Sequence, residues 1–159
     1  MKYKTIIIGL IVSIAAVNTK ALENPTEKFG LGVLLGEPTG VSFKYWFDKE
    51  RAVDGGIGCA FSENDSLQLH GDYLIHNNEI SNSEQWPVYY GIGALLLFKD
   101  GDKHHDNETV LGFRVPIGMT YLFEEDIPYE FFFEVAPVLE VAPRAGLDVN
   151  ASVGLRFYF

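Results

Sequence analysis

The last stretch of the chain, residues 146–159, reads GLDVNASVGLRFYF and decides the fold. Every second residue from Leu147 to Phe159 is apolar, whereas most residues between them, such as Asp148 and Arg156, are polar. Successive side chains of a β-strand point to opposite faces, so this alternation predicts one strand with an apolar and a polar face. The alternation runs on to an aromatic last residue, which is typical of a strand that closes a β-barrel in a membrane.

The same alternation recurs along the chain, and turn-forming residues such as Pro, Gly, Asn and Asp separate the alternating segments. Residues 76–85 are expected to form a polar loop. We expect eight strands, at residues 29–35, 41–47, 53–61, 67–75, 86–98, 110–123, 129–141 and 146–159. A sheet in lipid must close, because no water pairs with the N–H and C=O groups of an open edge. The predicted fold is therefore all-β, an eight-stranded antiparallel up-and-down transmembrane β-barrel.

The N-terminus has the features of a secretory signal peptide. Lys2 and Lys4 precede a short apolar run, and Ala21 follows as a small residue at the expected cleavage position. We predict a signal peptide at residues 1–21 and a barrel domain at residues 22–159. Cleavage removes three lysines and changes the formal net charge from -10 to -13. Such an acidic chain is a poor candidate for nucleic-acid binding.

Aromatic residues gather where even-numbered strands end and odd-numbered strands begin, which predicts a single aromatic rim. Both ends of the barrel domain lie at this rim, which we therefore assign to the periplasmic side. Rings at the boundary between lipid and water form such girdles in membrane barrels. The residues are Tyr45, Trp46, Phe47, Trp86, Tyr121, Phe123, Tyr129, Phe131, Phe157 and Phe159.

The segment at residues 34–46, LLGEPTGVSFKYW, resembles the opening hairpin of small, largely uncharacterised outer-membrane barrels of Gram-negative-type bacteria. The predicted architecture also resembles the eight-stranded outer membrane protein A and X barrels. This resemblance implies a barrel in the outer membrane without assigned catalytic residues. The terminal Phe159 looks like the signal that the barrel-assembly machinery reads. The implied partners are outer-membrane lipid, lipopolysaccharide and that machinery, with the barrel as a monomer.

Charged side chains fall on the face opposite the apolar one, and we expect them to form a charge network in the lumen. Folding the last strands about their turns places Arg114 diagonally across from Glu140, and Arg156 diagonally across from Glu130 and Glu134. Excess acidic charge would be relieved by raised carboxylate pKa values, or by Lys44 and His70. An eight-stranded barrel is only wide enough for its side chains, so we predict a plugged lumen. The network is Lys44, His70, Asp72, Arg114, Glu130, Glu134, Glu140 and Arg156.

Two groups of residues also allow a chemical interpretation. His70 and Asp72 share a face near Ser66 and could act as an acid–base pair, although a hydrogen-bond network is the ordinary role of such a pair. Residues 99–109 carry several Asp and His side chains, whose spacing matches neither a zinc motif nor a calcium loop. We therefore predict no catalytic residues, no cofactor and no metal site, and weak divalent-cation binding by this loop stays an alternative.

Three functions remain compatible with the sequence. The first is a non-enzymatic outer-membrane barrel that serves envelope structure or surface interaction, and this is the prediction. The second is an enzyme on the same fold, a lipid A acyl hydrolase or transferase. The third is a soluble periplasmic barrel of the lipocalin type, which would need an apolar interior and a charged exterior.

Overall fold

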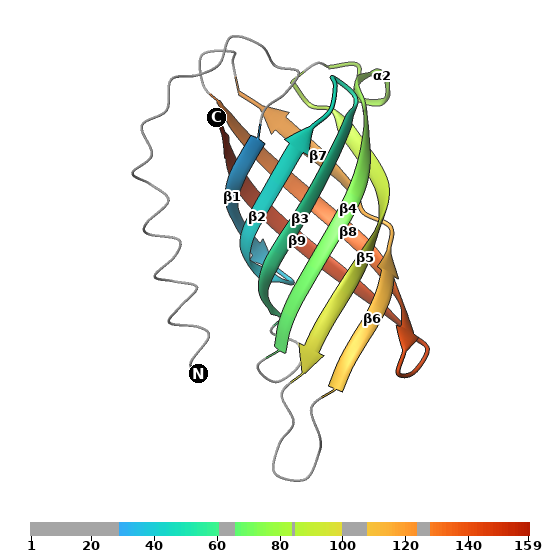
Figure 1. Ribbon diagram of the computed structural model, residues 1–159. Coiled ribbons are helices and arrows are strands. Elements are labelled where there is room, and N and C mark those ends of the chain that lie inside the picture. The colour runs from blue at the N-terminus through green and yellow to red at the C-terminus, as the bar shows by residue number, and fades with distance from the viewer. Residues whose placement is uncertain (1–28, 61–65, 84, 100–107, 124–127) are drawn as a thin grey trace.

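The alternating segments form a closed antiparallel barrel in the computed structural model, which describes residues 29–60, 66–83, 85–99, 108–123 and 128–159 (Figure 1). The predicted signal peptide and most of the acidic loop lie outside these residues. A single helical turn, α2 (Asn78–Ser81), accompanies the strands. The strands are β1 (Phe29–Gly36), β2 (Thr39–Trp46), β3 (Arg51–Ala60), β4 (Ser66–Asn77), β5 (Val88–Lys99), β6 (Glu108–Arg114), β7 (Ile117–Leu122), β8 (Tyr129–Ala142) and β9 (Gly146–Tyr158).

The barrel closes where the first strand pairs with the last. β1 runs antiparallel to β9, with Leu31 opposite Phe157 and Val33 opposite Leu155. The strands from β1 to β5 pair in chain order, β6 and β7 each pair with β5 and with β8, and β8 pairs with β9. The up-and-down order predicted from the sequence is therefore confirmed.

β6 and β7 are two parts of one pass across the barrel, so the nine strands make eight passes of the chain. Each pass is called a stave below. Pro116 lies between them and has no N–H group to give to the ladder. The register does not slip at this interruption: Arg114 lies opposite Gly93 of β5, and Ile117 lies opposite Tyr90. The predicted strand at residues 110–123 is thus one stave with a break at a proline.

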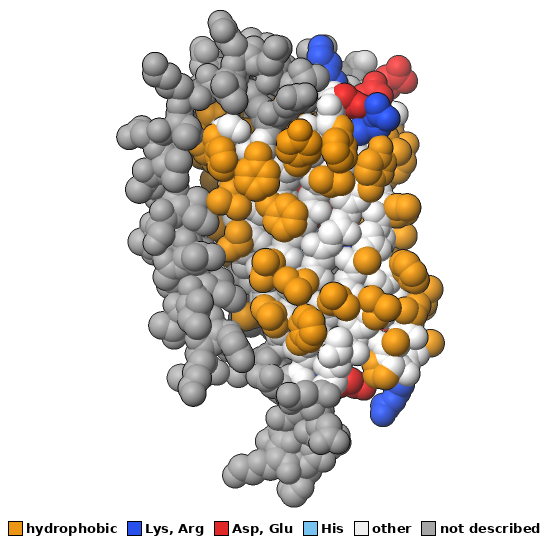
Figure 2. Space-filling model, viewed as in Figure 1, with side chains coloured by type: hydrophobic (Ala, Val, Ile, Leu, Met, Phe, Trp, Pro, Cys, Tyr) orange, Lys and Arg blue, Asp and Glu red, His pale blue; other side chains and the backbone are white. Residues whose placement is uncertain are grey.

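The two faces of each strand have opposite chemistry. On β8, Phe131, Phe133 and Leu139 point outward and are exposed, whereas Glu130 and Glu134 point inward and are buried. Figure 2 shows the outward side chains as an apolar band, with charged side chains gathered toward the ends of the barrel. This is the reverse of a lipocalin-type barrel. No helix among the described residues is long and apolar enough to cross a membrane.

The predicted loop at residues 76–85 begins later than expected. β4 continues through His76 to Asn77, because the alternation of inward and outward side chains extends to these residues. Asn77 then caps α2, its side chain accepting hydrogen bonds from the N–H groups of Glu79 and Ile80. His76 is consequently an inward, buried residue rather than a loop residue.

Aromatic rings meet at the end of the barrel where β1 begins and β9 ends, which we call the aromatic rim. The Tyr129 and Phe157 rings lie 5.2 Å apart, and those of Phe29 and Phe159 lie 5.5 Å apart. Trp86 contacts Tyr121 farther around the same rim. Trp46 lies at the same rim, and its side chain points inward and is buried, as the alternation along residues 41–47 predicts. The opposite end, to which the turn between β8 and β9 belongs, is called the loop rim.

Candidate functional site in the barrel lumen

The side chain of Glu130, on β8, is the centre of a buried cluster in the half of the lumen toward the aromatic rim. Lys44 Nζ, from β2, lies 3.1 Å and 3.2 Å from the two carboxylate oxygens of Glu130. The Tyr158 hydroxyl donates to the same carboxylate. Neither the Lys44 nor the Glu130 side chain is exposed to solvent. A buried charge must be paired and hydrogen-bonded to be tolerated, and Glu130 provides this for Lys44.

Arg156, from β9, joins the same cluster and links it to a further strand, β3. Its Nη1 atom lies 2.8 Å from Glu130 Oε1, and its Nη2 atom lies 2.7 Å from Asp54 Oδ2. Its Nε–H group donates to the Ser42 hydroxyl at 2.8 Å. The guanidinium also stacks 3.9 Å from the centre of the Phe132 ring. We call Lys44, Asp54, Glu130, Arg156 and Tyr158 the Glu130 cluster.

A second set of buried charges, the Glu134 cluster, consists of Asp72, Tyr89, Arg114 and Glu134. Arg114 Nη2 bonds to Glu134, and the Tyr89 hydroxyl donates to the other oxygen of that carboxylate at 3.0 Å. Arg114 Nε lies 3.2 Å from Asp72 Oδ1, with both side chains buried. Four different staves therefore meet at these contacts.

A glycine explains how Asp72 and Arg114 reach each other. Both lie in the same row as Gly93, on the strands that flank β5. A Cβ atom on Gly93 would lie 1.7 Å from Asp72 Oδ1. The missing side chain therefore leaves the space in which this ion pair forms.

The two clusters also separate a pair of like charges. Asp54 and Asp72 lie directly opposite each other on β3 and β4, with both side chains buried. Like charges in this position repel each other. Arg156 neutralises Asp54 and Arg114 neutralises Asp72, so each arginine serves one carboxylate of the pair.

The lumen changes character toward its two ends. Toward the loop rim, Leu95, Leu97, Val110 and Val138 point inward and form a buried apolar cluster. At the aromatic rim, the Trp46 indole N–H donates to the Tyr158 hydroxyl at 3.0 Å, next to Ala52. The charged clusters thus lie between two sets of apolar or aromatic side chains.

The structure brings together six of the eight residues that the sequence predicts for the lumen network. The predicted pairing of Arg156 with Glu130 is formed, but two other predicted pairings are not. The predicted pairing of Arg114 with Glu140 is wrong: Arg114 turns toward Asp72 and Glu134, because Gly93 opens that path. Glu140 is only half-buried, near the loop rim. The predicted pairing of Arg156 with Glu134 is also wrong, since β8 and β9 pair two residues out of the expected register. This register sets Arg156 opposite Glu130 and Glu134 opposite Ser152.

His70 faces the lumen but lies outside both clusters. A Cβ atom on the inward-facing Gly56 would lie 2.6 Å from the His70 ring, and His70 Nδ1 has no hydrogen-bond partner among the described residues. Asp72 is held by Arg114 instead, so the hydrogen bond that a His–Asp acid–base pair needs is not formed. The described residues contain no group of His, Cys, Asp and Glu side chains that could hold a metal ion.

Four residues of this site are absent from the predicted network, namely Asp54, His76, Tyr89 and Tyr158. His76 Nε2 lies 2.9 Å from Lys44 Nζ, and the two tyrosines of the clusters donate to carboxylates. The alternation along residues 146–159 predicts that Tyr158 lies on the polar, inward face, but it predicts no hydrogen-bond partner for the hydroxyl. Continuing the alternation of β4 by one step would have identified His76, whereas Tyr89 belongs to the least regular strand.

The described residues define a class: a small eight-stave antiparallel barrel with an apolar outer surface and ion-paired side chains in its lumen. No known protein family matches the sequence, and neither does any curated protein. The chain is similar to a solved structure, the N-terminal β-barrel domain of Pseudomonas aeruginosa OprF, with a TM-score of 0.64 and 11% identity. The match covers 83% of this chain and 97% of that one. It shows the fold, and it confirms the predicted likeness to barrels of the outer membrane protein A type.

Proposed function

We propose that this protein is a non-enzymatic integral outer-membrane β-barrel with a lumen plugged by its own side chains. The observation that carries the proposal is the division of side chains between the two faces of the barrel wall. Outward residues such as Ile92 and Phe113 are 69% and 60% exposed, whereas Lys44 and Glu130 are fully buried inside. If the hydrocarbon chains of lipids surround the barrel, the outward apolar side chains are in a favourable environment. The charged side chains would be unfavourable there and are placed inside.

The aromatic rim and the expected signal peptide support an outer-membrane location. Rings at one end of the barrel suit the boundary between lipid and water, where amphipathic side chains gather. Outer-membrane lipid and lipopolysaccharide would then surround the barrel, and the barrel-assembly machinery would insert it. The protein would contribute to envelope structure or to surface interactions as a monomer.

The side chains that fill the lumen argue against an open channel. The two charge clusters occupy the middle of the barrel. The apolar cluster that contains Leu95 lies toward the loop rim, and the Trp46–Tyr158 pair lies at the aromatic rim. An interior of this width is filled by ordinary side chains. Ions would have to break several buried ion pairs in order to pass.

Two measurements test the membrane barrel and its plug. The purified protein should partition into detergent and migrate differently on a gel before and after heating, and failure in both assays would refute a membrane barrel. In a planar bilayer, the inserted protein should give no steady open-channel current. Sustained conductance would refute the plugged lumen but would not contradict the membrane location.

The non-enzymatic role has its own test. Purified protein incubated with lipid A should leave its acyl chains unchanged over hours in detergent and in vesicles. Release or transfer of an acyl chain that is lost in the His70→Ala variant would refute this part of the proposal.

A further inference from the structure

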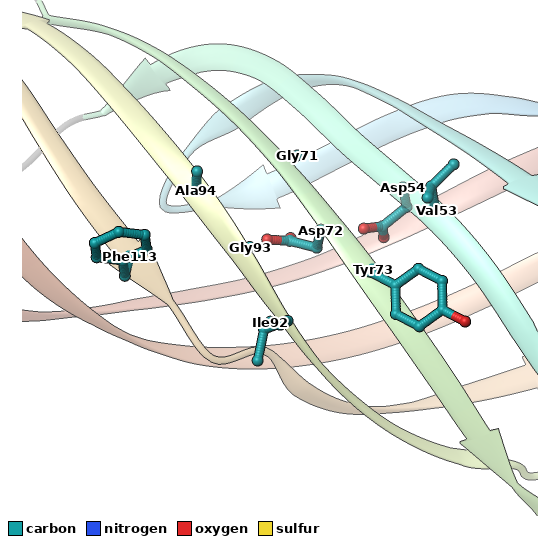
Figure 3. Close-up of a pocket in the computed structure, with 9 residues that line it drawn as sticks. All are labelled: Val53, Asp54, Gly71, Asp72, Tyr73, Ile92, Gly93, Ala94 and Phe113. Atoms are coloured by element: carbon teal, nitrogen blue, oxygen red, sulfur yellow. The ribbon is translucent and has the colours of Figure 1, made fainter.

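The outward surface over β3, β4 and β5 contains a groove with a volume of about 570 Å³. Figure 3 shows its lining residues on these strands, together with Phe113 on β6. The row that crosses the groove runs from Phe43 through Gly55, Gly71 and Ala94 to Phe113, one residue from each strand. The Phe43 ring lies over Gly55, so the hollow at mid-height of the barrel wall lies over Gly71 and Ala94, with Phe113 beside them. Figure 2 shows bare backbone surrounded by apolar side chains on this face.

Gly71, at the floor of the groove, is not required by the barrel itself. A Cβ atom on Gly71 would have only Asp54 O nearby, at 3.9 Å, which is an ordinary contact distance. Its φ is not in the left-handed region that favours glycine. Glycine weakens a strand interior, and in strands it often marks a place where a ligand approaches the backbone. The absence of a side chain at Gly71 therefore leaves the hollow open, and the packing of the lumen does not require it.

A cation stands at the aromatic-rim end of the same groove. Arg51, Val53 and Gly55 alternate on the outward face of β3, so Arg51 lies roughly 13 Å along the strand from Gly55. The Arg51 side chain is 60% exposed. Its Nε atom lies 2.6 Å from Asp48 Oδ2, and Arg51 lies diagonally across from Tyr73, which lines the groove. The guanidinium is thus held at the rim, one outward row beyond Val53 and Tyr73, which line the groove.

We propose that this groove binds one phospholipid, with an acyl chain over Gly71 and the phosphate at Arg51. The proposal rests on the membrane location proposed above. Arginine presents a planar fork of donors that matches phosphate oxygens. An apolar hollow with a cation at its end, at the height where headgroups meet water, has the two chemical features of a phospholipid. The hollow and Arg51 lie on one continuous face, so one molecule reaches both.

A phospholipid explains this surface better than a second copy of the chain. Small residues can let two membrane segments approach closely, but here Phe43, Tyr73 and Phe113 stand beside the small residues. A rigid barrel wall would have to insert a matching ridge between them. An acyl chain adapts to the hollow, and a headgroup also accounts for Arg51.

The groove is tested by native mass spectrometry of the full chain released from detergent micelles that contain phosphatidylglycerol. The wild type should retain one lipid. The Gly71→Leu variant, whose Cβ atom meets no close neighbour in the wall, should fill the hollow and retain about tenfold less. Roughly ten carbon–carbon contacts of the chain with the groove would be lost. The control is Ala151→Leu, on the outward face of β9 away from the groove, and it should retain lipid like the wild type.

The headgroup contact is tested by a matched pair in one turn. Arg51→Gln should lower phosphatidylglycerol retention by about fivefold, the factor for one lost cation–phosphate attraction. Lys49→Gln removes the same charge two residues away and should have little effect. Equal losses in both variants would mean general attraction to anionic lipid and would overturn the site.

Other results would also decide the question. Unchanged retention in Gly71→Leu, equal losses in Gly71→Leu and Ala151→Leu, or a lipid-free dimer of the wild type would each refute the phospholipid site. Every variant is first checked for a heat-dependent shift on a gel. A folded, heat-modifiable wild type without bound lipid refutes only the groove, whereas a wild type without that shift refutes the membrane barrel.

Discussion

At the scale of single residues, the carboxylate of Glu130 holds two buried cations at once. Lys44 and Arg156 both bond to it, and Tyr158 donates a further hydrogen bond. Each cation lies in a space without solvent, where an unpaired charge costs several kcal/mol. The stability of the lumen therefore depends strongly on this one side chain.

Replacing Glu130 by glutamine should lower the free energy of unfolding by about 3–5 kcal/mol, because it keeps the shape and removes the negative charge. Urea titration of the refolded protein in phospholipid vesicles measures this. Glu140→Gln is the control, since Glu140 is only half-buried, and it should change stability by less than about 0.5 kcal/mol. Equal effects would contradict the assignment of Glu130 as the centre of the cluster.

Two neighbouring glycines provide a test of which face is inward. Gly93→Ala should destabilise the barrel by about 1–3 kcal/mol, because the new methyl group would meet Asp72 and the backbone of Gly71. Gly71→Ala should instead stabilise it by about 0.5–1 kcal/mol, the ordinary gain of replacing glycine in a strand. The same urea titration compares them, and a loss of stability in both variants would show that Gly71 is required by the wall.

At the scale of the strand, the outward face of β8 runs from the aromatic rim to the middle of the barrel. Tyr129 lies at the rim beside Phe157, and Val135 lies three outward positions farther along. If lipid surrounds the barrel, the cost of a charge on this face must depend on depth. A soluble barrel would show no such dependence.

Val135→Lys should therefore cost about 2–4 kcal/mol of stability in vesicles, and Tyr129→Lys about 0–1 kcal/mol beyond the loss of its ring contact. Both variants change the same face of the same strand, so they control for each other. Similar small losses at the two positions would argue against a hydrocarbon surround.

At the scale of the whole molecule, closure depends on the chain ends, because β1 and β9 are the first and last strands. The Phe159 N–H group donates to Phe29 O at 3.1 Å, and the two rings are in contact. A ring pair of this kind contributes about 0.5–1.5 kcal/mol. The terminal ring is thus a modest part of the stability of the folded barrel.

If Phe159 is also the assembly signal, Phe159→Ala should impair insertion in cells far more than refolding in vitro. We expect the amount of heat-modifiable protein in the outer membrane to fall several-fold. The free energy of unfolding of the purified variant should fall only by about the ring-pair contribution. Phe157→Ala also removes a rim ring and is the control; an equal defect in cells would refute a special role for the last residue.

The sequence by itself determined the fold and the facing of most strands, because both follow from local rules. Alternation of apolar and polar residues assigns each side chain to a face, and the closing strand at residues 146–159 is the clearest case. The burial of Lys44, Arg114, Glu130 and Arg156 could therefore be predicted without a structure. The predicted strand ends at residue 75, so the alternation was not applied to His76, although β4 continues to Asn77.

Only the tertiary structure decided which charges meet. The partners of Arg114 and Arg156 depend on the register between β8 and β9 and on the space over Gly93, and neither is a local property. Two residues of register are enough to set Arg156 directly opposite Glu130 instead of midway between Glu130 and Glu134. Ion pairs in a barrel join strands that are distant in sequence, as with Arg156 and Asp54. The closed geometry fixes these distances, whereas alternation fixes only the side of the wall on which each residue lies.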